Sequence, residues 1–201
     1  MRTTAMLSAV TPSQYTVPLE ELVQYGAMGT IIHKMAEMAL LNEGDPTMLW
    51  EQCKDSWDTV QKGSLNLNPS DANPQAFIEK YKEDFDWHKA EIEIEMYDDD
   101  LMVKGTTDLI IPYKGELSIA DWKTSRSYSK EKKEHYFKQL AMYAILCRRD
   151  IKYLVICPLN PNNKSGYGKP IETDEVEKYK QLALKDLEIF NKKYRCKQSS
   201  T

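Results

Sequence analysis

The chain has 201 residues, which is enough for one domain with a full hydrophobic core. Hydrophobic residues make up 41% and charged residues 29%, and this balance excludes an intrinsically disordered chain. The formal net charge of -4 argues against a protein that coats nucleic acid with a uniformly basic surface, although it is compatible with a local basic groove.

The cysteines and the apolar runs indicate the compartment. The four cysteines are scattered and form no C-x-x-C pair, which favours free thiols in a reducing compartment; they are Cys53, Cys147, Cys157 and Cys196. No apolar run approaches the roughly 20 residues needed to cross a membrane, and the N-terminus is a poor secretory signal. We therefore expect a cytoplasmic protein that is not attached to a membrane.

The first part of the chain predicts helices. Residues up to about 17 are expected to be irregular, and a helix is expected over 19–41, with apolar side chains at helical spacing from Leu22 to Ala39. Gly26 and Gly29 predict that this helix is either kinked or divided in two. A second helix is expected from Pro46, followed by a turn-rich loop over 63–73 and a third helix over 74–87.

The second part of the chain predicts a sheet with helices. Strands are expected over 90–96, 101–112 and 116–123 as a three-strand meander, then a helix over 131–149, a strand over 151–157 and a closing helix over 173–194. This order predicts an α/β fold with a mixed central sheet flanked by helices. We expect a single domain over 1–201, with a helical portion at 1–88 and an α/β core at 89–201.

Two acids and a lysine stand on the second and third predicted strands. Asp108 is followed by Leu109, Ile110 and Ile111, where a buried carboxylate without a partner would be costly. Asp121 and Lys123 are two residues apart, so both side chains point to the same face of their strand. This arrangement predicts a site for a hard divalent cation and a water. Lys123 would stabilise charge on a phosphate as it builds and, if burial lowers its pKa, would also assist deprotonation.

Other candidates are weaker alone. His33 shares a helical face with Glu37, and imidazole is acceptable to ions such as Mn²⁺; a core or surface histidine is the ordinary alternative. Glu91, Glu93 and Glu95 face one side of their strand, and either Glu95 or Glu93 could reach the site, or all could face solvent. Gly105 allows a close backbone approach or a bulge before Asp108.

The helix after Lys123 carries groups that suit nucleic acid. Gln139 and Tyr143 are spaced i, i+4 and can hydrogen-bond a phosphate or a base. The segment before them is locally basic despite two glutamates, and contains Lys123, Arg126, Lys130, Lys132, Lys133 and Lys138. We consider a contact with the phosphate backbone and a plain solvated face as alternatives for this patch.

Taken together, these residues resemble the PD-(D/E)XK nucleases, in particular the RecB-type branch. The resemblance runs from about residue 25 to residue 146 and rests on the GTIIH helix, Asp108, the DWKT run from Asp121 to Thr124, and Gln139-x-x-x-Tyr143. With LSAVTPS near the N-terminus, the pattern is similar to the mitochondrial genome maintenance exonuclease group and its phage and bacterial relatives. One departure is Thr107, where this branch commonly has proline.

The resemblance implies a restriction-endonuclease-like core and assigns roles to residues. His33, Asp108, Asp121 and the main-chain carbonyl of Trp122 would bind Mg²⁺ or Mn²⁺, and Lys123 would be catalytic together with Asp108 and Asp121. Gln139 and Tyr143 would position the DNA. Beyond what the resemblance implies, we expect Thr124, Ser125, Arg126 and Lys130 to bind substrate and consider Glu37 and Glu95 as accessory acids. The cysteines do not follow the spacing of relatives that hold an iron–sulfur cluster, so no cluster is expected.

The function expected from this resemblance is that of a Mg²⁺- or Mn²⁺-dependent DNA nuclease in repair, recombination or replication. We expect an exonuclease acting on single-stranded DNA or free ends and leaving 5′-phosphates, in a bacterial or phage-infected cytoplasm, with a recombination or replication protein as a candidate partner. The alternatives are a non-catalytic nucleic-acid-binding subunit on the same fold, and an endonuclease or RNA-directed nuclease.

Overall fold

The computed structural model describes residues 1–10, 19–41 and 68–195. Five strands form one sheet in the order β1-β2-β3-β4-β5. They are β1 (Glu91–Asp98), β2 (Val103–Tyr113), β3 (Glu116–Lys123), β4 (Tyr153–Pro158) and β5 (Ile171–Thr173). The β3–β4 pair is parallel and the other three pairs are antiparallel, so the sheet is mixed. The predicted α/β fold with a mixed central sheet is confirmed.

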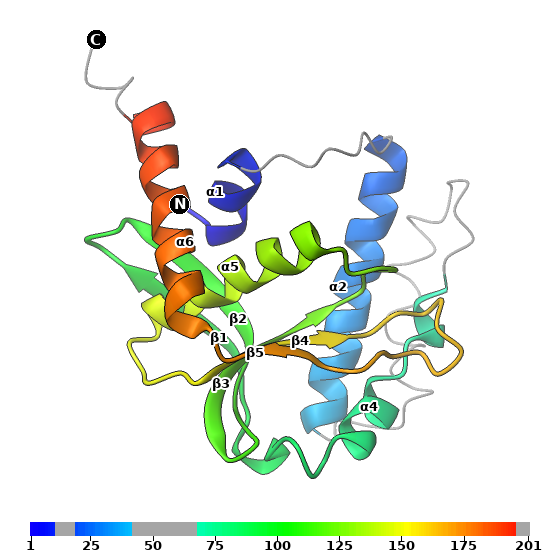
Figure 1. Ribbon diagram of the computed structural model, residues 1–201. Coiled ribbons are helices and arrows are strands. Elements are labelled where there is room, and N and C mark those ends of the chain that lie inside the picture. The colour runs from blue at the N-terminus through cyan, green and yellow to red at the C-terminus, as the bar shows by residue number, and fades with distance from the viewer. Residues whose placement is uncertain (11–18, 42–67, 196–201) are drawn as a thin grey trace.

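Helices cover both faces of this sheet (Figure 1). The helix α2 (Leu19–Leu41) and the short α4 (Pro74–Lys80) pack on one face. The other face is covered by α1 (Thr3–Val10), α5 (Lys130–Leu146) and α6 (Val176–Phe190), the last of which continues as a π-helix over Asn191–Arg195. Short 3-10 helices at Pro69–Asp71 and Trp87–Lys89 flank α4 and the turn that follows it.

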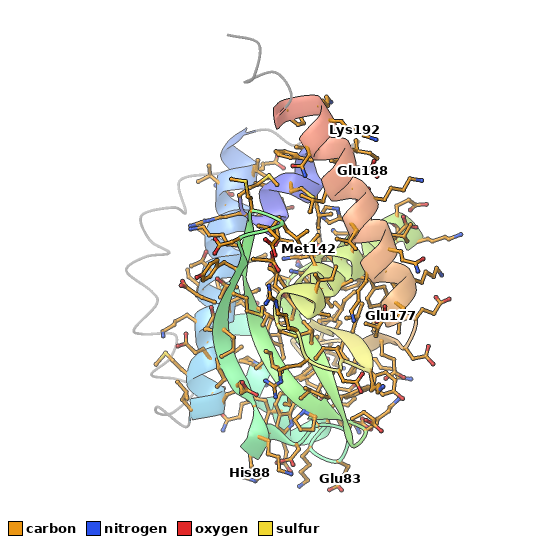
Figure 2. The ribbon with its side chains drawn as sticks, turned by 90° about the vertical axis from the view of Figure 1, so that its left-hand side faces the viewer. Glu83, His88, Met142, Glu177, Glu188 and Lys192 are labelled. Carbon is orange, nitrogen blue, oxygen red and sulfur yellow. The ribbon has the colours of Figure 1, made fainter. Side chains whose placement is uncertain are left out.

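Each face has its own core because successive residues of the central strands point to opposite sides. Leu109 and Ile111 pack into the core beneath α2, and Ile110 between them packs into the core beneath α5. Burial on both faces explains why β2 is continuously apolar from Leu109 to Ile111. Figure 2 shows Met142 in the middle of the molecule, whereas Glu177, Glu188 and Lys192 follow the outer side of α6.

The long helix α2 is continuous from Leu19 to Leu41. Its buried apolar side chains recur at the spacing of one helical face; they are Met28, Ile31, Ile32, Met35, Ala36 and Met38. Leu22, expected on this face, is exposed instead. Gly26 and Gly29 therefore do not divide it, and tertiary packing outweighs their low helix propensity. The helix expected from Pro46 and residues 63–67 of the expected loop lie outside the described residues.

Three predictions about local structure are wrong. The N-terminal stretch is not irregular throughout, because Thr3–Val10 forms α1 and buries Met6 and Leu7 in the core under α5. The helix expected over 74–87 ends at Lys80, because Phe85 leaves helical spacing and forms a bridge to Tyr113. The strand β5 at Ile171–Thr173 falls where a loop was expected. It forms a strand because it pairs with β4, a contact between distant segments that the local sequence does not show.

The first strand is irregular at one residue. Its glutamates are exposed and its isoleucines half-buried, as the alternating sequence predicts. Ile92, however, packs with the core under α2 and Ile94 with the core under α5. Glu93 between them has a φ of 53°, in the left-handed region that a strand residue rarely adopts. The strand thus changes the core against which it packs at Glu93.

Candidate active site

The site is built where β2 and β3 separate. Their ladder ends at the pair Leu109 and Ala120, so Asp108 and Asp121 occupy the first opposed positions beyond it. Here the main-chain N–H of Trp122 donates to Asp108 Oδ2 at 2.7 Å. The carboxylate takes the place of a main-chain acceptor and is fixed by that bond. The fork therefore holds two acids side by side on a rigid support.

A third acid stands at the same level of the sheet. In the β1–β2 register, Ile92 pairs with Leu109 and Ile94 with Thr107, which leaves Glu93 opposite Asp108. Partial desolvation and the Asp108 carboxylate raise the pKa of Glu93 above its ordinary value. Glu95, which was named as the accessory acid, pairs instead with Thr106. The neighbouring strand thus presents Glu93 to the two acids.

The helix α2 places His33 at the fork. Its Nδ1 lies 3.3 Å from Asp108 Oδ2. Burial lowers the pKa of His33, but the Asp108 and Asp121 carboxylates together raise it above its ordinary value. Burial in turn raises the pKa of Asp108, while His33, Lys123 and the Trp122 N–H lower it further than burial raises it. Glu37, one turn further along α2, is half-buried and ion-paired with Lys34 at 2.8 Å.

Asp121 and Lys123 form a buried contact, with Lys123 Nζ against Asp121 Oδ2. Burial and the adjacent Asp108 carboxylate raise the pKa of Asp121. Burial lowers the pKa of Lys123, but the Asp121 and Asp108 carboxylates raise it well above its ordinary value. The condition under which Lys123 would assist deprotonation, a lowered pKa, is therefore not met, because two carboxylates outweigh desolvation. Lys123 is an ammonium ion in this site.

Gln139 and Tyr143 lie behind the acids on α5. The Gln139 Nε2 donates to the Tyr143 hydroxyl at 2.8 Å, and both side chains are buried. Burial and the Asp121 carboxylate raise the pKa of Tyr143 to about 12. The Tyr143 ring crosses β2 at Gly105, where an added Cβ would lie 2.5 Å from Tyr143 Cε1. Gly105 thus allows the Tyr143 ring to approach the main chain of β2 closely, as the position of this glycine before Asp108 predicted.

The segment after β3 borders the site. Thr124 Oγ1 lies 3.8 Å from the position of a Cβ added at Gly29, so α2 passes close to the end of β3. Ser125 Oγ is 2.6 Å from the Tyr136 hydroxyl. Arg126 and Lys130 are exposed beyond it. Their position next to Lys123 in the chain gives this side of the site an accessible positive surface.

The basic patch expected between Lys123 and Lys138 is smaller than its sequence suggests. Lys138 is buried and forms an ion pair with Asp186 of α6 at 2.7 Å. Lys123 is buried against Asp121. Neither lysine adds much to the accessible surface, because α5 turns Lys138 inward and the end of β3 holds Lys123 against Asp121. Arg126, Lys130 and Lys132 remain exposed.

The donor set suits a hard divalent cation. Asp121 Oδ2 is buried and, although it lies against the Lys123 ammonium, accepts no well-aligned hydrogen bond from any donor. Such a carboxylate oxygen has a lone pair available for a ligand. Among the described residues, no group of three or more His, Cys, Asp or Glu side chains is already arranged around one point. The side chains contact one another instead, so binding would require His33 and Lys123 to shift from the carboxylates.

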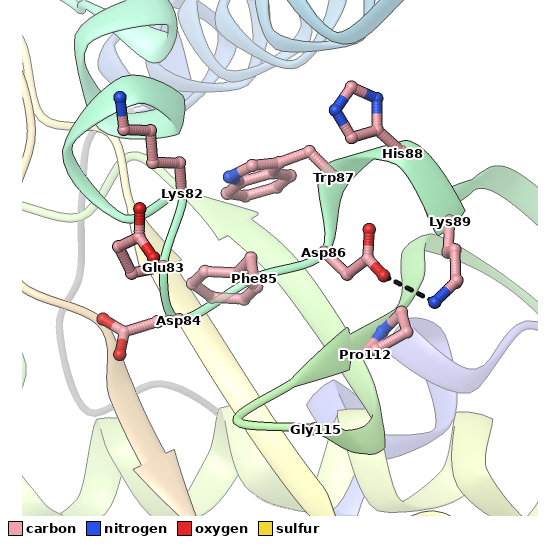
Figure 3. Close-up of a pocket in the computed structure, with 10 residues that line it drawn as sticks. All are labelled: Lys82, Glu83, Asp84, Phe85, Asp86, Trp87, His88, Lys89, Pro112 and Gly115. Atoms are coloured by element: carbon pink, nitrogen blue, oxygen red, sulfur yellow. Dashed lines mark ion pairs between the residues drawn. The ribbon is translucent and has the colours of Figure 1, made fainter.

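A separate pocket of about 390 Å³ opens between the turn after α4 and the β2–β3 hairpin (Figure 3). Phe85 and Trp87 are stacked in its wall at 4.6 Å between ring centroids. Trp87 is also stacked on Trp122 of β3 at 6.1 Å, from the side of the sheet that α2 covers. None of the acids at the fork lines this pocket. Its aromatic wall supports the strand that carries Asp121 and Lys123.

Three residues of the site were missed by sequence reasoning or given too little weight. Glu93 was named only as an alternative to Glu95, and the hairpin register could have selected it. Tyr136 lies under Lys123, with 5.0 Å between Nζ and its ring centroid. The Tyr128 hydroxyl donates to the Lys123 carbonyl at 2.9 Å. No motif in the sequence predicted either tyrosine.

Comparison with known proteins agrees with this geometry. The model of the PD-(D/E)XK nuclease superfamily matches residues 9–198, and the chain therefore belongs to that superfamily. It is accordingly a nuclease, a hydrolase acting on the phosphodiester bonds of a nucleic acid. The assignment to this superfamily, made from the spaced motifs, is confirmed. Members of the superfamily in general use divalent metals such as Mg²⁺.

A solved structure agrees on the fold. The crystal structure of a protein named "Putative exonuclease" from Eubacterium rectale matches with a TM-score of 0.55 and 16% identity, over 94% of this chain and 77% of that chain. The structure of SSO0001 matches with a TM-score of 0.35 and 17% identity, over 80% of this chain and 74% of that chain, too low a score to indicate a shared fold. No curated protein gives a significant match. Among the described residues, no helix is long and apolar enough to cross a membrane.

Proposed function

We propose that this nuclease is a Mg²⁺- or Mn²⁺-dependent DNA exonuclease of the RecB-type branch. The observation that carries the proposal is the fork of β2 and β3, where Asp108 and Asp121 stand opposed with His33 and Lys123 against their carboxylates. A protein that only binds nucleic acid has little use for two buried acids beside an ammonium ion. The cost of burying them is understandable if the site must hold a cation and a phosphate.

The acids and the imidazole would hold the metal. Asp121 Oδ2, which lies against the Lys123 ammonium but accepts no well-aligned hydrogen bond, and Asp108, which the Trp122 N–H fixes in place, would be the central ligands. His33 and the Trp122 carbonyl complete the set, and Glu93 adds negative charge from β1. A divalent cation bound there would polarise the phosphoryl oxygens, generate the nucleophile from water and stabilise the leaving 3′-oxygen. Cleavage of the P–O3′ bond leaves a 5′-phosphate.

Lys123 serves this reaction by its charge. The surrounding carboxylates keep its pKa raised, so it is not a general base at neutral pH. Its ammonium lies at the end of β3 and can donate to a nonbridging phosphate oxygen or orient the attacking water. A fixed positive charge in a largely desolvated site stabilises the negative charge that develops on the phosphate during attack.

Exposed cations at the edge of the site favour a nucleic-acid strand that enters beside α5. Arg126 and Lys130 would contact the phosphate backbone, and Thr124 and Ser125 would offer hydroxyls near the end of β3. Gln139 and Tyr143 are buried, so we propose that they act indirectly. They would hold Asp121 in position and shape the route that the nucleic acid takes. We propose single-stranded DNA or a free end as substrate, with roles in repair, recombination or replication.

A nuclease assay tests the proposal. DNA labelled at one end, single- or double-stranded, is incubated with Mg²⁺, Mn²⁺ or EDTA and the products are resolved on a gel. We expect metal-dependent degradation that Lys123→Ala lowers by about 100- to 1000-fold, the scale for loss of a charge-stabilising group. Lys152→Ala is the matched control, because Lys152 also pairs with an aspartate two residues earlier, but on the surface. Full activity of Lys123→Ala would reject the assignment.

The product pattern separates the alternatives. A ladder that begins at one labelled end indicates an exonuclease and gives its polarity. Cleavage of a closed circular strand indicates an endonuclease, and degradation of RNA alone indicates an RNA-directed enzyme. Tight metal-independent binding to DNA without cleavage would replace the proposal with the non-catalytic binding subunit.

A further inference from the structure

The ammonium of Lys123 has a second neighbour besides Asp121. It lies over the ring of Tyr136 on α5, with 5.0 Å between Nζ and the ring centroid. The face of an aromatic ring carries negative charge density, and a desolvated ammonium in this position is attracted to it. Lys123 is only 15% exposed, so water screens this attraction weakly.

The position of the Tyr136 ring is fixed from the lysine's own segment. The Tyr136 hydroxyl and Ser125 Oγ are 2.6 Å apart and hydrogen-bonded, and Ser125 is two residues beyond Lys123. Tyr128 approaches the Tyr136 ring edge-on at 6.3 Å, and its hydroxyl donates to the Lys123 carbonyl at 2.9 Å. One tyrosine thus holds the main chain of Lys123 and the other lies under its charged end.

Lysine needs such support in a site of this kind. Its side chain has four rotatable bonds and loses considerable rotamer freedom when held in one place. The atom that it contacts, Asp121 Oδ2, is also the carboxylate oxygen that we propose binds the cation. When that carboxylate is engaged by a cation, the ring of Tyr136 still lies against the ammonium and favours it at this position.

We propose that Tyr136 is a positioning residue, whose ring face holds the Lys123 ammonium in the site independently of Asp121. This inference rests on the proposed function of Lys123. The role belongs to the ring's electrostatics, and the Ser125 hydrogen bond only sets the ring's orientation. Tyr136 does not touch the reacting atoms.

The sharpest test changes the ring's electrostatics and keeps its shape. Tyr136→Phe is compared with the same substitution carrying one, two or three ring fluorines, which progressively weaken the negative face. We expect kcat to fall with each fluorine, to a total of roughly 3- to 30-fold, the range that corresponds to a cation–π contact. KM should stay within about twofold, because substrate contacts are unchanged. Tyr136→Leu should have about the same kcat as the variant with three fluorines.

The metal-free protein gives a second readout. In protein labelled with ¹³C-lysine, the ε-methylene of Lys123, assigned with Lys123→Arg, should show an upfield ring-current shift. Tyr136→Leu should abolish the shift, Tyr136→Phe should retain it, and it should persist when Mg²⁺ is added. Tyr194→Leu is the matched control and should leave the Lys123 shift unchanged. Its ring also lies under a lysine, with 5.2 Å between Lys193 Nζ and the ring centroid, but it belongs to a different part of the chain.

The outcomes separate this inference from the proposed function. If wild type degrades DNA and Lys123→Ala does not, the proposed function stands. The role of Tyr136 alone is then overturned if kcat is the same across the fluorinated variants, or if the chemical shift of the Lys123 ε-methylene is unchanged in Tyr136→Leu. If Lys123→Ala remains active, the function fails first. Should Tyr136→Leu unfold, the fluorinated series, which preserves volume, still decides the question.

Discussion

Glu93 lies opposite Asp108 across the β1–β2 pair, with its backbone in the left-handed region at a φ of 53°. A residue other than glycine in this conformation costs roughly 1–2 kcal/mol and persists only where surrounding structure imposes it. The strand changes the core it packs against at that residue, and the acid is thereby held in line with Asp108 and Asp121. A strained acid at the fork is best explained by a role in the site.

We expect Glu93→Gln to weaken metal binding without unfolding the protein. The substitution removes a negative charge near the site and keeps the side chain's size, so the half-saturating Mg²⁺ concentration should rise about 3- to 10-fold. Activity measured against Mg²⁺ concentration gives this value. Glu95→Gln, two residues along the same strand and opposite Thr106, should leave it unchanged. Equal effects of the two substitutions would show that only the overall charge of β1 matters.

The pair of His33 and Asp108 predicts a pH-dependent stability in EDTA. The folded protein raises the pKa of His33 above its ordinary 6.5, so the folded state binds the proton more tightly than the unfolded chain. The resulting stabilisation is complete below about pH 6.5 and disappears as the pH rises through the raised folded value. His33→Gln should therefore lower Tm more at pH 5.5 than at pH 8.5, as measured by thermal unfolding. A difference that grows with pH would contradict the sign.

Gly105 should not accept a side chain. An added Cβ would lie 2.5 Å from Tyr143 Cε1 and 2.9 Å from Thr3 Oγ1, so either β2 or the Tyr143 ring must move. We expect Gly105→Ala to lower the free energy of unfolding by about 1–3 kcal/mol. The control is Gly26→Ala in α2, where an added Cβ meets nothing within 4 Å and should stabilise by about 0.5–1 kcal/mol. Chemical denaturation of both variants measures the two opposite changes.

The buried pair of Lys138 and Asp186 joins α5 to α6 at 2.7 Å. Asp186→Leu leaves a buried ammonium without a partner and should cost about 3–5 kcal/mol of unfolding free energy. The double substitution Lys138→Met with Asp186→Leu should recover most of that loss, because two apolar groups can replace an ion pair in a core. Urea titrations of the single and double variants test this. A double variant as unstable as Asp186→Leu would show that the packing, not the charge, was lost.

Much of the fold was accessible from the sequence because its periodicity was strong. The helix α2 and the strand β3 were predicted with the bounds that the structure has, and the two-residue spacing of Asp121 and Lys123 placed both on one face. The helix α1 was missed because eight residues are marginal alone and depend on the docking of Met6 and Leu7.

The rest of the site depends on contacts between distant segments. Only the hairpin register puts Glu93 opposite Asp108. Lys138 belongs to a basic run in the sequence, yet its partner Asp186 comes from another helix. The raised pKa of Lys123 follows from two carboxylates and could not be judged from burial alone. Tyr136 gave no signal, since its partners lie in the chain that precedes α5.

The separation of the site between a hairpin and a helix has a consequence for folding in the cell. Asp108, Asp121 and Lys123 belong to one hairpin, whose local contacts can form early, whereas His33 reaches Asp108 only after a long loop of chain has closed. A partly folded chain therefore has the acids without the imidazole that α2 brings. From the proposed role of His33 as a metal ligand, we expect competence to cut nucleic acid to arrive only with the docking of α2.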